Sequence, residues 1–296
     1  MSSGMQGIKL ALVGGDDREL VFIPELVKMG AYIKVIGFEK APKINGVEVA
    51  ATLQDAVYGV DAILLPMPGT DERGVVKAKY AQNPLQLTKE VLQLISPAVP
   101  IFIGWARPAL KNVAKAFGLK LVEYNNLDEL TIMNSIPSAE GAIQMAMEAT
   151  NITIHGSKSM VLGFGRSAFT LAHTLQGMGA QVTLVARKQG DLARAHLMGM
   201  KPVHFMDLAQ EVPEAEIVFN TVPALVLDRV VLDALNREAV IVDIASAPGG
   251  TDFEYAALLG IKALLAPGLP GIVAPKTAGL ILAKVLPKLI LRQLVT

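Results

Sequence analysis

A glycine motif in the second half of the chain has the residue types and spacing of a phosphate-binding turn. Residues 161–168 end a short apolar run and carry the pattern G-x-G-x-x-A. Gly163 permits a tight turn, Gly165 lets the backbone approach a pyrophosphate, and Ala168 allows the next helix to pack closely on the strand. The first amides of that helix then face the phosphates. This pattern is typical of a dinucleotide-binding site.

The segments around the motif complete a strand–helix–strand unit. An amphipathic helix is predicted over 168–178, followed by Gly179 and a strand over 181–186. The motif alone is equally compatible with an ordinary glycine turn. Its place between a strand and an amphipathic helix favours the dinucleotide-binding interpretation.

Two adjacent cations follow the second of these strands, where the adenine ribose of a bound dinucleotide would lie. NAD-binding sites usually have Asp or Glu there to accept hydrogen bonds from the ribose. Arg187 and Lys188 cannot accept such bonds. They can neutralise a 2′-phosphate, and Arg187 can form a forked pair with it. We therefore predict NADP(H) rather than NAD(H), with a pair of solvated loop charges as the alternative.

The composition narrows the function classes. The chain has 296 residues, which is enough for two domains, with 27 basic and 27 acidic side chains and no cysteine. Balanced charge argues against nucleic-acid and anionic-membrane partners. The absence of cysteine excludes disulfides and fits a cytoplasmic protein. Although 52% of the residues are hydrophobic, no run approaches the roughly 20 apolar residues of a membrane helix. The four histidines lack metal-ligand spacing, so no metal is expected.

The two halves of the chain open alike. Residues 7–14 realign onto 156–163 at an offset of 149 (156 minus 7). This internal repeat predicts two doubly wound, Rossmann-like parallel-sheet domains of the α/β class. Asp16 stands in the first half where Gly165 stands in the second. A carboxylate there would repel a pyrophosphate, so the first half should hold no dinucleotide, even though Glu39 lies near the ribose position.

Apolar runs and helix breakers predict five strands in each half. They are 8–13, 32–37, 61–65, 100–104 and 119–123 in the first half, and 158–162, 181–186, 216–220, 239–243 and 262–265 in the second. A helix is predicted over 137–150 with Pro137 in its first turn, and a last helix over 275–294.

The predicted domain organisation follows from these elements. The first domain covers 1–130 and is joined by the C-terminal helix 275–296. A linking helix covers 131–150, and the NADP-binding domain covers 151–274. By analogy with two-domain dehydrogenases, we expect a cleft between the two domains.

Candidate site residues lie where the strands are predicted to end, because ligands of such sheets bind beyond the carboxyl ends of the strands. The predicted cofactor-binding residues are Gly163, Phe164, Gly165, Arg166, Ser167, Ala168, Arg187, Lys188, Asn220, Thr221, Pro223, Ser246 and Leu269. The predicted catalytic residues are Glu140, Lys276, Arg107 and Ser135.

Three of the catalytic candidates have a specific predicted role. Arg107 and Lys276 would each hold a substrate carboxylate. Glu140 would act as an acid or base if burial raises its pKa. Each is equally compatible with an ordinary surface or capping role, and Glu140 with closing a capping box.

Several segments of the chain resemble the A subunit of dipicolinate synthase from spore-forming bacteria. They are 13–16, 134–141, 163–166, 220–223, 248–253 and 266–279, and together they span nearly the whole length. The resemblance implies the last step of dipicolinate formation, branching from the lysine pathway. In that step the cyclic product of dihydrodipicolinate synthase loses water and transfers a hydride to NADP⁺. The resemblance also implies a flavoprotein-like partner, the B subunit of dipicolinate synthase, and expression in the sporulating mother cell.

Two alternatives remain open. A 2-hydroxy-acid or amino-acid dehydrogenase on the same scaffold needs a paired histidine, and the unpatterned histidines argue against it. A non-catalytic NADP-binding subunit is the other, because no catalytic base is unmistakable in the sequence. The high apolar content also predicts a homo-oligomer, since an interface between copies consumes further apolar residues.

Overall fold

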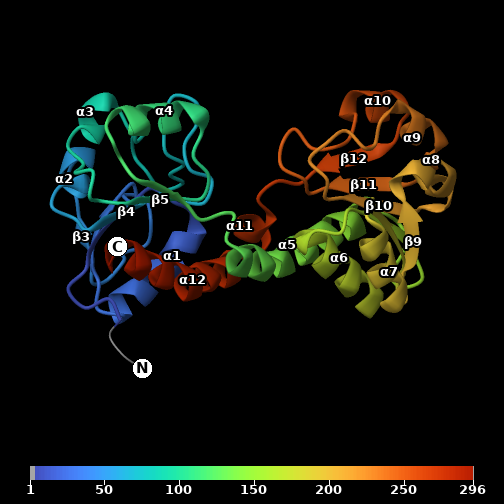
Figure 1. Cartoon of the computed structure of the whole chain (residues 1–296), viewed down its shortest axis with the longest axis horizontal. Helices are drawn as coiled ribbons and strands as arrows, with labels where there is room; N and C mark the ends of the chain where they lie inside the picture. The colour runs from blue at the N-terminus through green and yellow to red at the C-terminus, as the bar shows by residue number, and fades with distance from the viewer. Residues whose placement is uncertain (1–3, 296) are drawn as a thin grey trace. The chain divides into compact units, whose positions relative to one another are not determined.

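The computed structural model describes residues 4–295 and consists of two α/β units (Figure 1). One unit contains the chain up to Thr131 together with the stretch from Ala274 onward, and the other contains Ile132–Val273. Each unit has one six-stranded parallel sheet with helices on both faces. The predicted fold class, two doubly wound α/β domains, is confirmed.

The sheet of the first unit has the strand order β3-β2-β1-β4-β5-β6. Its strands are β1 (Lys9–Val13), β2 (Tyr32–Ile36), β3 (Glu48–Val49), β4 (Ala62–Leu64), β5 (Ile101–Ile103) and β6 (Leu121–Glu123). Helices α1 (Asp17–Lys28) and α12 (Pro275–Val295) lie on one face, and α2 (Leu53–Val57), α3 (Lys89–Leu92) and α4 (Pro108–Ala116) on the other (Figure 1). The central strands are apolar because both of their faces are covered.

Helix α12 packs against α1 at a glycine. A Cβ atom at Gly279 would lie 2.6 Å from the carbonyl oxygen of Arg18 and 2.8 Å from Cβ of Val21. Only glycine therefore allows the two helices to approach this closely. The contact attaches the C-terminal helix to the first unit.

The second sheet repeats the same order, β9-β8-β7-β10-β11-β12. Its strands are β7 (Lys158–Leu162), β8 (Gln181–Ala186), β9 (Lys201–His204), β10 (Ile217–Asn220), β11 (Val240–Asp243) and β12 (Lys262–Leu265). Its helices are α5 (Asp128–Ala149), α6 (Arg166–Gly177), α7 (Gln189–Leu197), α8 (Leu208–Glu211), α9 (Arg229–Ala234), α10 (Phe253–Leu258) and α11 (Leu269–Val273), with short 3₁₀ turns at Phe205–Asp207 and Val212–Glu214.

Alternating strand residues build the two cores of the second unit. Val161 and Leu184 pack with residues of α5, α6 and α7, whereas Met160 and Val185 pack with residues of α8, α9 and α10. This alternation follows from the two-residue period of a strand. Figure 1 shows the two helical layers on opposite faces of the sheet.

The internal repeat is structural as well as sequential. The elements β1, α1 and β2 have the bounds of β7, α6 and β8 shifted by 149 (158 minus 9), except that β8 is longer by one residue. The strand register is the same too, since Lys9 pairs with Tyr32 and Lys158 with Gln181. The two halves therefore share the course of these three elements, while the turn before the helix differs locally, since Gly15 has a φ of +141° and the equivalent Phe164 has no positive φ.

Each sheet has one edge strand that the sequence analysis missed. β3 is two exposed residues long, and β9 contains Pro202 and a single buried residue. Neither shows the buried apolar run of a central strand, and proline is tolerated only at an edge. The third strand of each half was therefore absent from the prediction.

Helix α5 begins at Asp128, so its predicted start at Pro137 is wrong. Asp128 and Glu129 occupy the first turn, where the helix dipole favours carboxylates. Pro137 lies inside the helix, and the hydroxyls of Ser135 and Ser138 donate to carbonyl oxygens in the surrounding turns. The prediction placed Pro137 in the first turn because proline is favoured at that position of a helix.

Candidate dinucleotide-binding site

The glycine motif joins the carboxyl end of β7 to the start of α6. Gly163 has a φ of +106°, and a Cβ there would lie 2.5 Å from Oγ1 of Thr221. Gly165 has a φ of −77°, which any residue adopts, and a Cβ there would meet no atom within 4 Å. The backbone and the packing thus require glycine at 163 but not at 165. Open space before Gly165 is what a closely approaching phosphate needs.

The first turn of α6 is not capped by a side chain. Gly165 is the N-cap residue, it makes no side-chain capping bond, and the first turn has no acidic residue. A helix start of this kind presents its amides and the positive end of the helix dipole to an anion. Ala168 is fully buried and holds the helix against the sheet. The exposed Arg166 and the half-buried Phe164 and Ser167 lie in the same turn.

Arg187 and Lys188 follow the carboxyl end of β8, and both side chains are exposed. Lys188 is the N-cap residue of α7. Within residues 4–295, neither side chain forms an ion pair. Both charges are therefore available to an anionic ligand. The donor set fits a phosphate better than ribose hydroxyls, because neither side chain has an acceptor.

A buried carboxylate that the sequence analysis overlooked, Asp243, organises the loops that follow β10 and β11. Its Oδ2 accepts hydrogen bonds from Asn220 Nδ2 (2.9 Å), the Gly250 amide (2.8 Å) and Thr251 Oγ1 (2.7 Å). Asp243 is completely buried, and its Oδ1 accepts from the Ala245 amide. A buried carboxylate with this many donors fixes the loops around it. An acidic residue at the end of an apolar strand was the available sequence signal.

The side chains of two predicted cofactor-binding residues make their contacts inside the protein. Asn220 is fully buried, donates to Asp243 and to the Val222 carbonyl, and accepts from the Val222 amide. Leu269 is buried in the core, and a Cβ added to Gly141 would lie 3.2 Å from its Cβ. The side chains of Asn220 and Leu269 thus have internal partners, and the predicted part of these two residues in cofactor binding stays a prediction. Both side chains support the loops.

Three further predicted cofactor residues lie at the carboxyl edge of the sheet. Thr221 donates its hydroxyl to the Leu162 carbonyl at 2.8 Å, which ties β10 to the glycine turn. Pro223 and Ser246 follow β10 and β11 and are exposed. The carboxyl edge therefore combines the glycine turn, the two cations and these loops.

Two catalytic candidates, Ser135 and Glu140, lie in α5. The Ser135 side chain is buried, donates to the Ile132 carbonyl and bonds Oγ1 of Thr170 at 2.6 Å, which joins α5 to α6. Glu140 is exposed in the middle of α5. The burial on which its predicted acid or base role depends is therefore absent, and a residue inside a helix cannot close a capping box. Both expectations for Glu140 are corrected.

The two cationic candidates belong to the first unit. Arg107 precedes α4, lies 5.6 Å from the centre of the Trp105 ring and pairs with Glu72 at 3.5 Å. Lys276 is exposed in the first turn of α12. Both cations remain accessible to a carboxylate ligand.

The first unit closes its own glycine turn with carboxylates. Asp16 caps α1 and forms a forked pair with Arg18 at 2.7 and 2.9 Å, while Glu19 accepts from the Asp16 amide at 2.7 Å. Burial raises the pKa of Glu19 to about 7. Burial would also raise the pKa of Asp16, but the hydrogen bonds and charge of Arg18 hold it below its ordinary value. These groups engage amides at the start of α1, whereas the start of α6 in the second unit has no side-chain cap.

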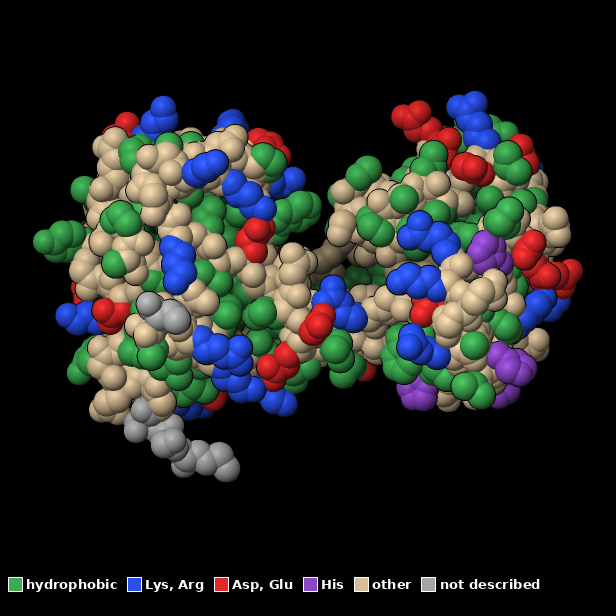
Figure 2. Space-filling model, in the orientation of Figure 1, with side chains coloured by type: hydrophobic (Ala, Val, Ile, Leu, Met, Phe, Trp, Pro, Cys, Tyr) green, Lys and Arg blue, Asp and Glu red, His purple; other side chains and the backbone are tan. Residues whose placement is uncertain are grey.

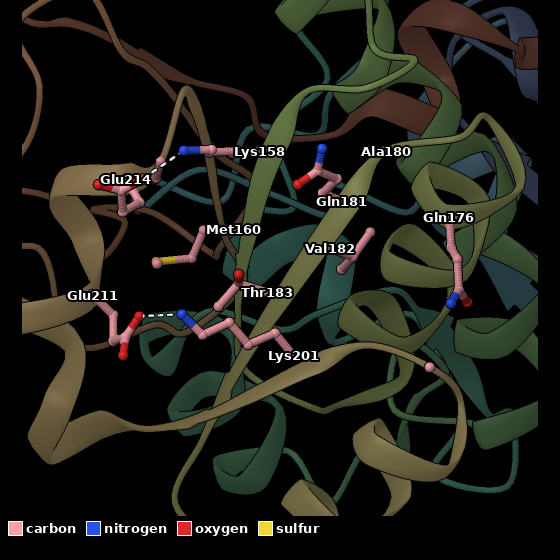
Figure 3. A pocket seen from close by; sticks show the side chains of 12 residues that line it. Lys158, Met160, Gln176, Ala180, Gln181, Val182, Thr183, Lys201, Glu211 and Glu214 are labelled. Carbon is pink, nitrogen blue, oxygen red and sulfur yellow. Dashed lines mark hydrogen bonds and ion pairs between the residues drawn. The ribbon is translucent and has the colours of Figure 1, made fainter.

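A hollow of about 480 Å³ lies at the amino ends of strands of the second sheet, opposite the carboxyl ends described above (Figure 3). Lys158 and Lys201 start strands β7 and β9 in its wall and pair with Glu214 and Glu211. Ligands of doubly wound sheets bind at the carboxyl ends of the strands, and both lysines here are already neutralised. We do not assign this hollow to the dinucleotide.

In a comparison with known proteins, the two parts of the chain match two different family models. Residues 9–125 match the family described as the N-terminal domain of the dipicolinate synthase A subunit, and residues 138–294 match the alanine dehydrogenase/PNT C-terminal domain. The A subunit of dipicolinate synthase from Bacillus subtilis (strain 168) is 41% identical over 97% of each chain. The chain belongs to the family of dipicolinate synthase A subunits.

Solved structures agree with this assignment. The crystal structure of the dipicolinate synthase A subunit from Bacillus halodurans superposes with a TM-score of 0.92 at 41% identity and covers 97% of this chain and 98% of that one. A transhydrogenase from Sinorhizobium meliloti shares the fold at 15% identity, with a TM-score of 0.70 over 97% and 95% of the two chains. The second part of this family member is a dehydrogenase-type nucleotide-binding domain. No helix within residues 4–295 is long and apolar enough to cross a membrane.

Proposed function

We propose that this chain is an NADP-dependent oxidoreductase subunit that forms dipicolinate, pyridine-2,6-dicarboxylate. Its substrate is the cyclic product of dihydrodipicolinate synthase, which loses one water, one hydride and one proton in all as the ring becomes aromatic. NADP⁺, when bound, accepts the hydride. The observation that carries the proposal is an uncapped glycine turn beside two exposed cations, in a chain 41% identical to the A subunit of a dipicolinate synthase.

The second unit would bind the cofactor. The amides at the start of α6 would hold the pyrophosphate over Gly165, and Arg187 and Lys188 would hold the 2′-phosphate. Pro223 and Ser246 would lie near the rest of the nucleotide, because they follow β10 and β11 at the same edge. Asn220 and Asp243 act by fixing those loops.

The first unit would bind the substrate. Arg107 and Lys276 are its candidates for the two substrate carboxylates, and each is accessible in the structure. Aromatisation supplies a large thermodynamic drive, so orienting the ring is the main task left to the protein. We assign no side chain as the base.

We also propose a partner and a setting. The chain would act with the flavoprotein-like B subunit of dipicolinate synthase, form a homo-oligomer, and work in the mother-cell cytoplasm during sporulation. Support comes from the family resemblance and from relatives described as A subunits. Co-purification with the B subunit tests the partnership.

A non-catalytic NADP-binding subunit is the second candidate function. It is favoured by the exposure of Glu140 and by the engagement of Ser135 with Ile132 and Thr170. In that case the partner would supply the groups that move protons. A 2-hydroxy-acid or amino-acid dehydrogenase has only fold-level support, from neighbours at 13% to 16% identity.

The deciding experiment measures dipicolinate and NADPH formed from freshly generated dihydrodipicolinate synthase product and NADP⁺. The chain is assayed alone and with the B subunit. Equal amounts of dipicolinate and NADPH with the chain alone establish it as the oxidoreductase. Product only with both chains assigns the reaction to the complex. No product in either mixture, with NADPH binding intact, rejects the proposed reaction.

A further inference from the structure

We propose that His204 is a positioning residue that sets the preference of this site for a 2′-phosphorylated dinucleotide. The inference rests on the proposed use of NADP(H) and assigns a role to a side chain that the sequence analysis treated as structural. All four histidines belong to the second unit, and Figure 2 shows histidine side chains at its surface. Only His204 among them is hydrogen-bonded to the Arg187–Lys188 turn within the described chain.

His204 reaches this turn because of its place in the sheet. It is the last residue of the edge strand β9 and pairs with Ala186, the last residue of β8. Arg187 and Lys188 come immediately after Ala186. The ring of His204 therefore lies beside the first peptide groups beyond the strand end.

Both ring nitrogens are engaged, and their partners define the tautomer. Nε2 lies 3.1 Å from the carbonyl oxygen of Arg187, which can only accept, so Nε2 carries the proton. Nδ1 accepts from the amide of Met206 at 3.2 Å and caps the 3₁₀ turn that follows β9. The neutral ring thus connects the end of β9 to the carbonyl of Arg187.

This connection fixes the backbone from which both cations extend. The Arg187 carbonyl belongs to the peptide group that joins Arg187 to Lys188, and Lys188 begins α7 on the other side. A backbone held before binding loses less entropy when the phosphate is bound. His204 is half-buried and brings no negative charge to the turn. His204 therefore adds no carboxylate that would compete for the two cations, and the nearby Asp191 of α7 pairs with Arg194.

In the first unit, the equivalent turn is held by a negatively charged side chain, that of Glu39. Glu39 accepts from the Gly37 amide and from the Gln82 amide, both at 2.9 Å. That carboxylate stabilises the turn but would repel a 2′-phosphate. A neutral donor in place of a carboxylate is what a phosphate-binding turn requires.

Two substitutions separate the hydrogen bonds of the ring. In His204→Gln, the side-chain amide nitrogen takes the place of Nε2 and can still donate to Arg187. In His204→Asn, the side-chain oxygen takes the place of Nδ1 and keeps the Met206 cap, but nothing reaches Arg187. The dissociation constants of NADPH and NADH are measured for each purified variant by nucleotide fluorescence. No turnover is needed.

His204→Asn should reduce the affinity ratio of NADPH over NADH by about threefold to tenfold, as expected for the loss of one hydrogen bond. In His204→Gln, the affinity ratio of NADPH over NADH should stay within about twofold of the wild-type value, because the bond to Arg187 is kept. His196→Asn, an exposed substitution on α7, is the matched control and should leave the ratio unchanged. Thermal unfolding should show that all three variants fold.

Three results would overturn the inference. An unchanged ratio in His204→Asn would show that the Arg187 contact does not matter for the phosphate. Equal losses in His204→Asn and His204→Gln, or parallel weakening of NADPH and NADH, would indicate a general structural role. A wild-type protein without preference for NADPH would reject the NADP proposal itself, and that failure is visible before any variant is made.

Discussion

Two turns of this molecule stand in the same strand–helix–strand frame and have opposite electrostatics. In the first unit, the start of α1 is closed by Asp16 and Glu19, and Arg18 completes the cluster. In the second unit, the start of α6 follows Gly165 and has no side-chain cap. One strand–helix–strand frame thus serves either to close a helix with the chain's own carboxylates or to leave it open to an anionic ligand.

The difference extends to the end of the second strand. Glu39 folds back onto backbone amides in the first unit, whereas Arg187 and Lys188 remain exposed in the second. Both positions are therefore acidic in the first unit, whereas in the second unit one is glycine and the other belongs to a pair of exposed cations. A swap of single residues between the turns tests whether these side chains alone decide binding.

Gly165→Asp, which copies the first unit, should have the largest effect. The new carboxylate would cap the α6 amides and repel the pyrophosphate, so NADPH affinity should fall by at least about 1000-fold. Because a Cβ at this position meets nothing within 4 Å, the variant should fold. Isothermal titration with NADPH measures the loss, and thermal unfolding checks the fold.

Gly177→Asp is the matched control for this substitution. It adds the same carboxylate at the last residue of α6, where a Cβ also meets nothing within 4 Å. NADPH affinity should stay near the wild-type value. If Gly165→Asp binds NADPH normally, the pyrophosphate is not held at this turn.

The reverse swap, Asp16→Gly, should destabilise the first unit without creating a binding site. It removes the cap of α1 and leaves Arg18, which is 6% exposed, without its forked partner. We expect a loss of about 3 kcal/mol in the free energy of unfolding. The only tryptophan, Trp105, reports this unit in a urea titration. Wild-type stability would show that the cluster is not needed to hold the turn.

Arg187→Asp brings an acidic residue to the second unit, as Glu39 does in the first. The substitution removes a donor to the 2′-phosphate and supplies an acceptor for ribose hydroxyls. The affinity ratio of NADPH over NADH should fall by about 100-fold, within the range for charged hydrogen bonds. Competition binding with both nucleotides measures the ratio, with Arg194→Asp on α7 as control. Unchanged affinities for both nucleotides would place the 2′-phosphate elsewhere.

The sequence predicted correctly those features that depend on the type of a single residue or on a run of apolar residues. The repeat and the Asp16–Gly165 contrast predicted both sheets and separated the unit with an open helix start from the closed one. The central strands were found because burial on both faces leaves a continuous apolar run. The edge strands β3 and β9 were missed because the first is two exposed residues long and the second contains a proline and one buried residue.

Side-chain roles were harder to predict, because a polar residue near a strand end can either contact a ligand or form hydrogen bonds inside the protein. Asn220 and Ser135 have the types expected in a site, yet tertiary packing gives them internal partners. Asp243 and His204 act through hydrogen bonds to residues distant in the sequence. No local pattern encodes such partners, since they depend on which loops the fold brings together.

Glu19→Gln tests how much the ionisation of buried Glu19 lowers the free energy of unfolding. The folded-state pKa of Glu19 is about 7, above the ordinary value of 4.5, so the folded protein binds the proton more tightly than the unfolded chain. Wild-type stability should therefore fall as pH rises from about 4.5 to 7, by about 2 kcal/mol, and the glutamine variant should lack this loss. Asp16, whose pKa is lowered, titrates below this window. Urea titrations at pH 5 and pH 7.5 that change equally in both proteins would rule out the assigned titration.

Arg107→Ala and Lys276→Ala test the proposed division of labour between the units, with the smallest expected effect. Each removes one carboxylate partner from the first unit, so the apparent KM for the cyclic substrate should rise by about tenfold. The NADPH dissociation constant should not change, because the cofactor residues belong to the second unit. Lys115→Ala, on α4 of the same unit, is the control. Wild-type KM in either variant would remove that residue from the substrate site. A parallel loss of NADPH affinity would show that the two ligands do not divide between the units in this way.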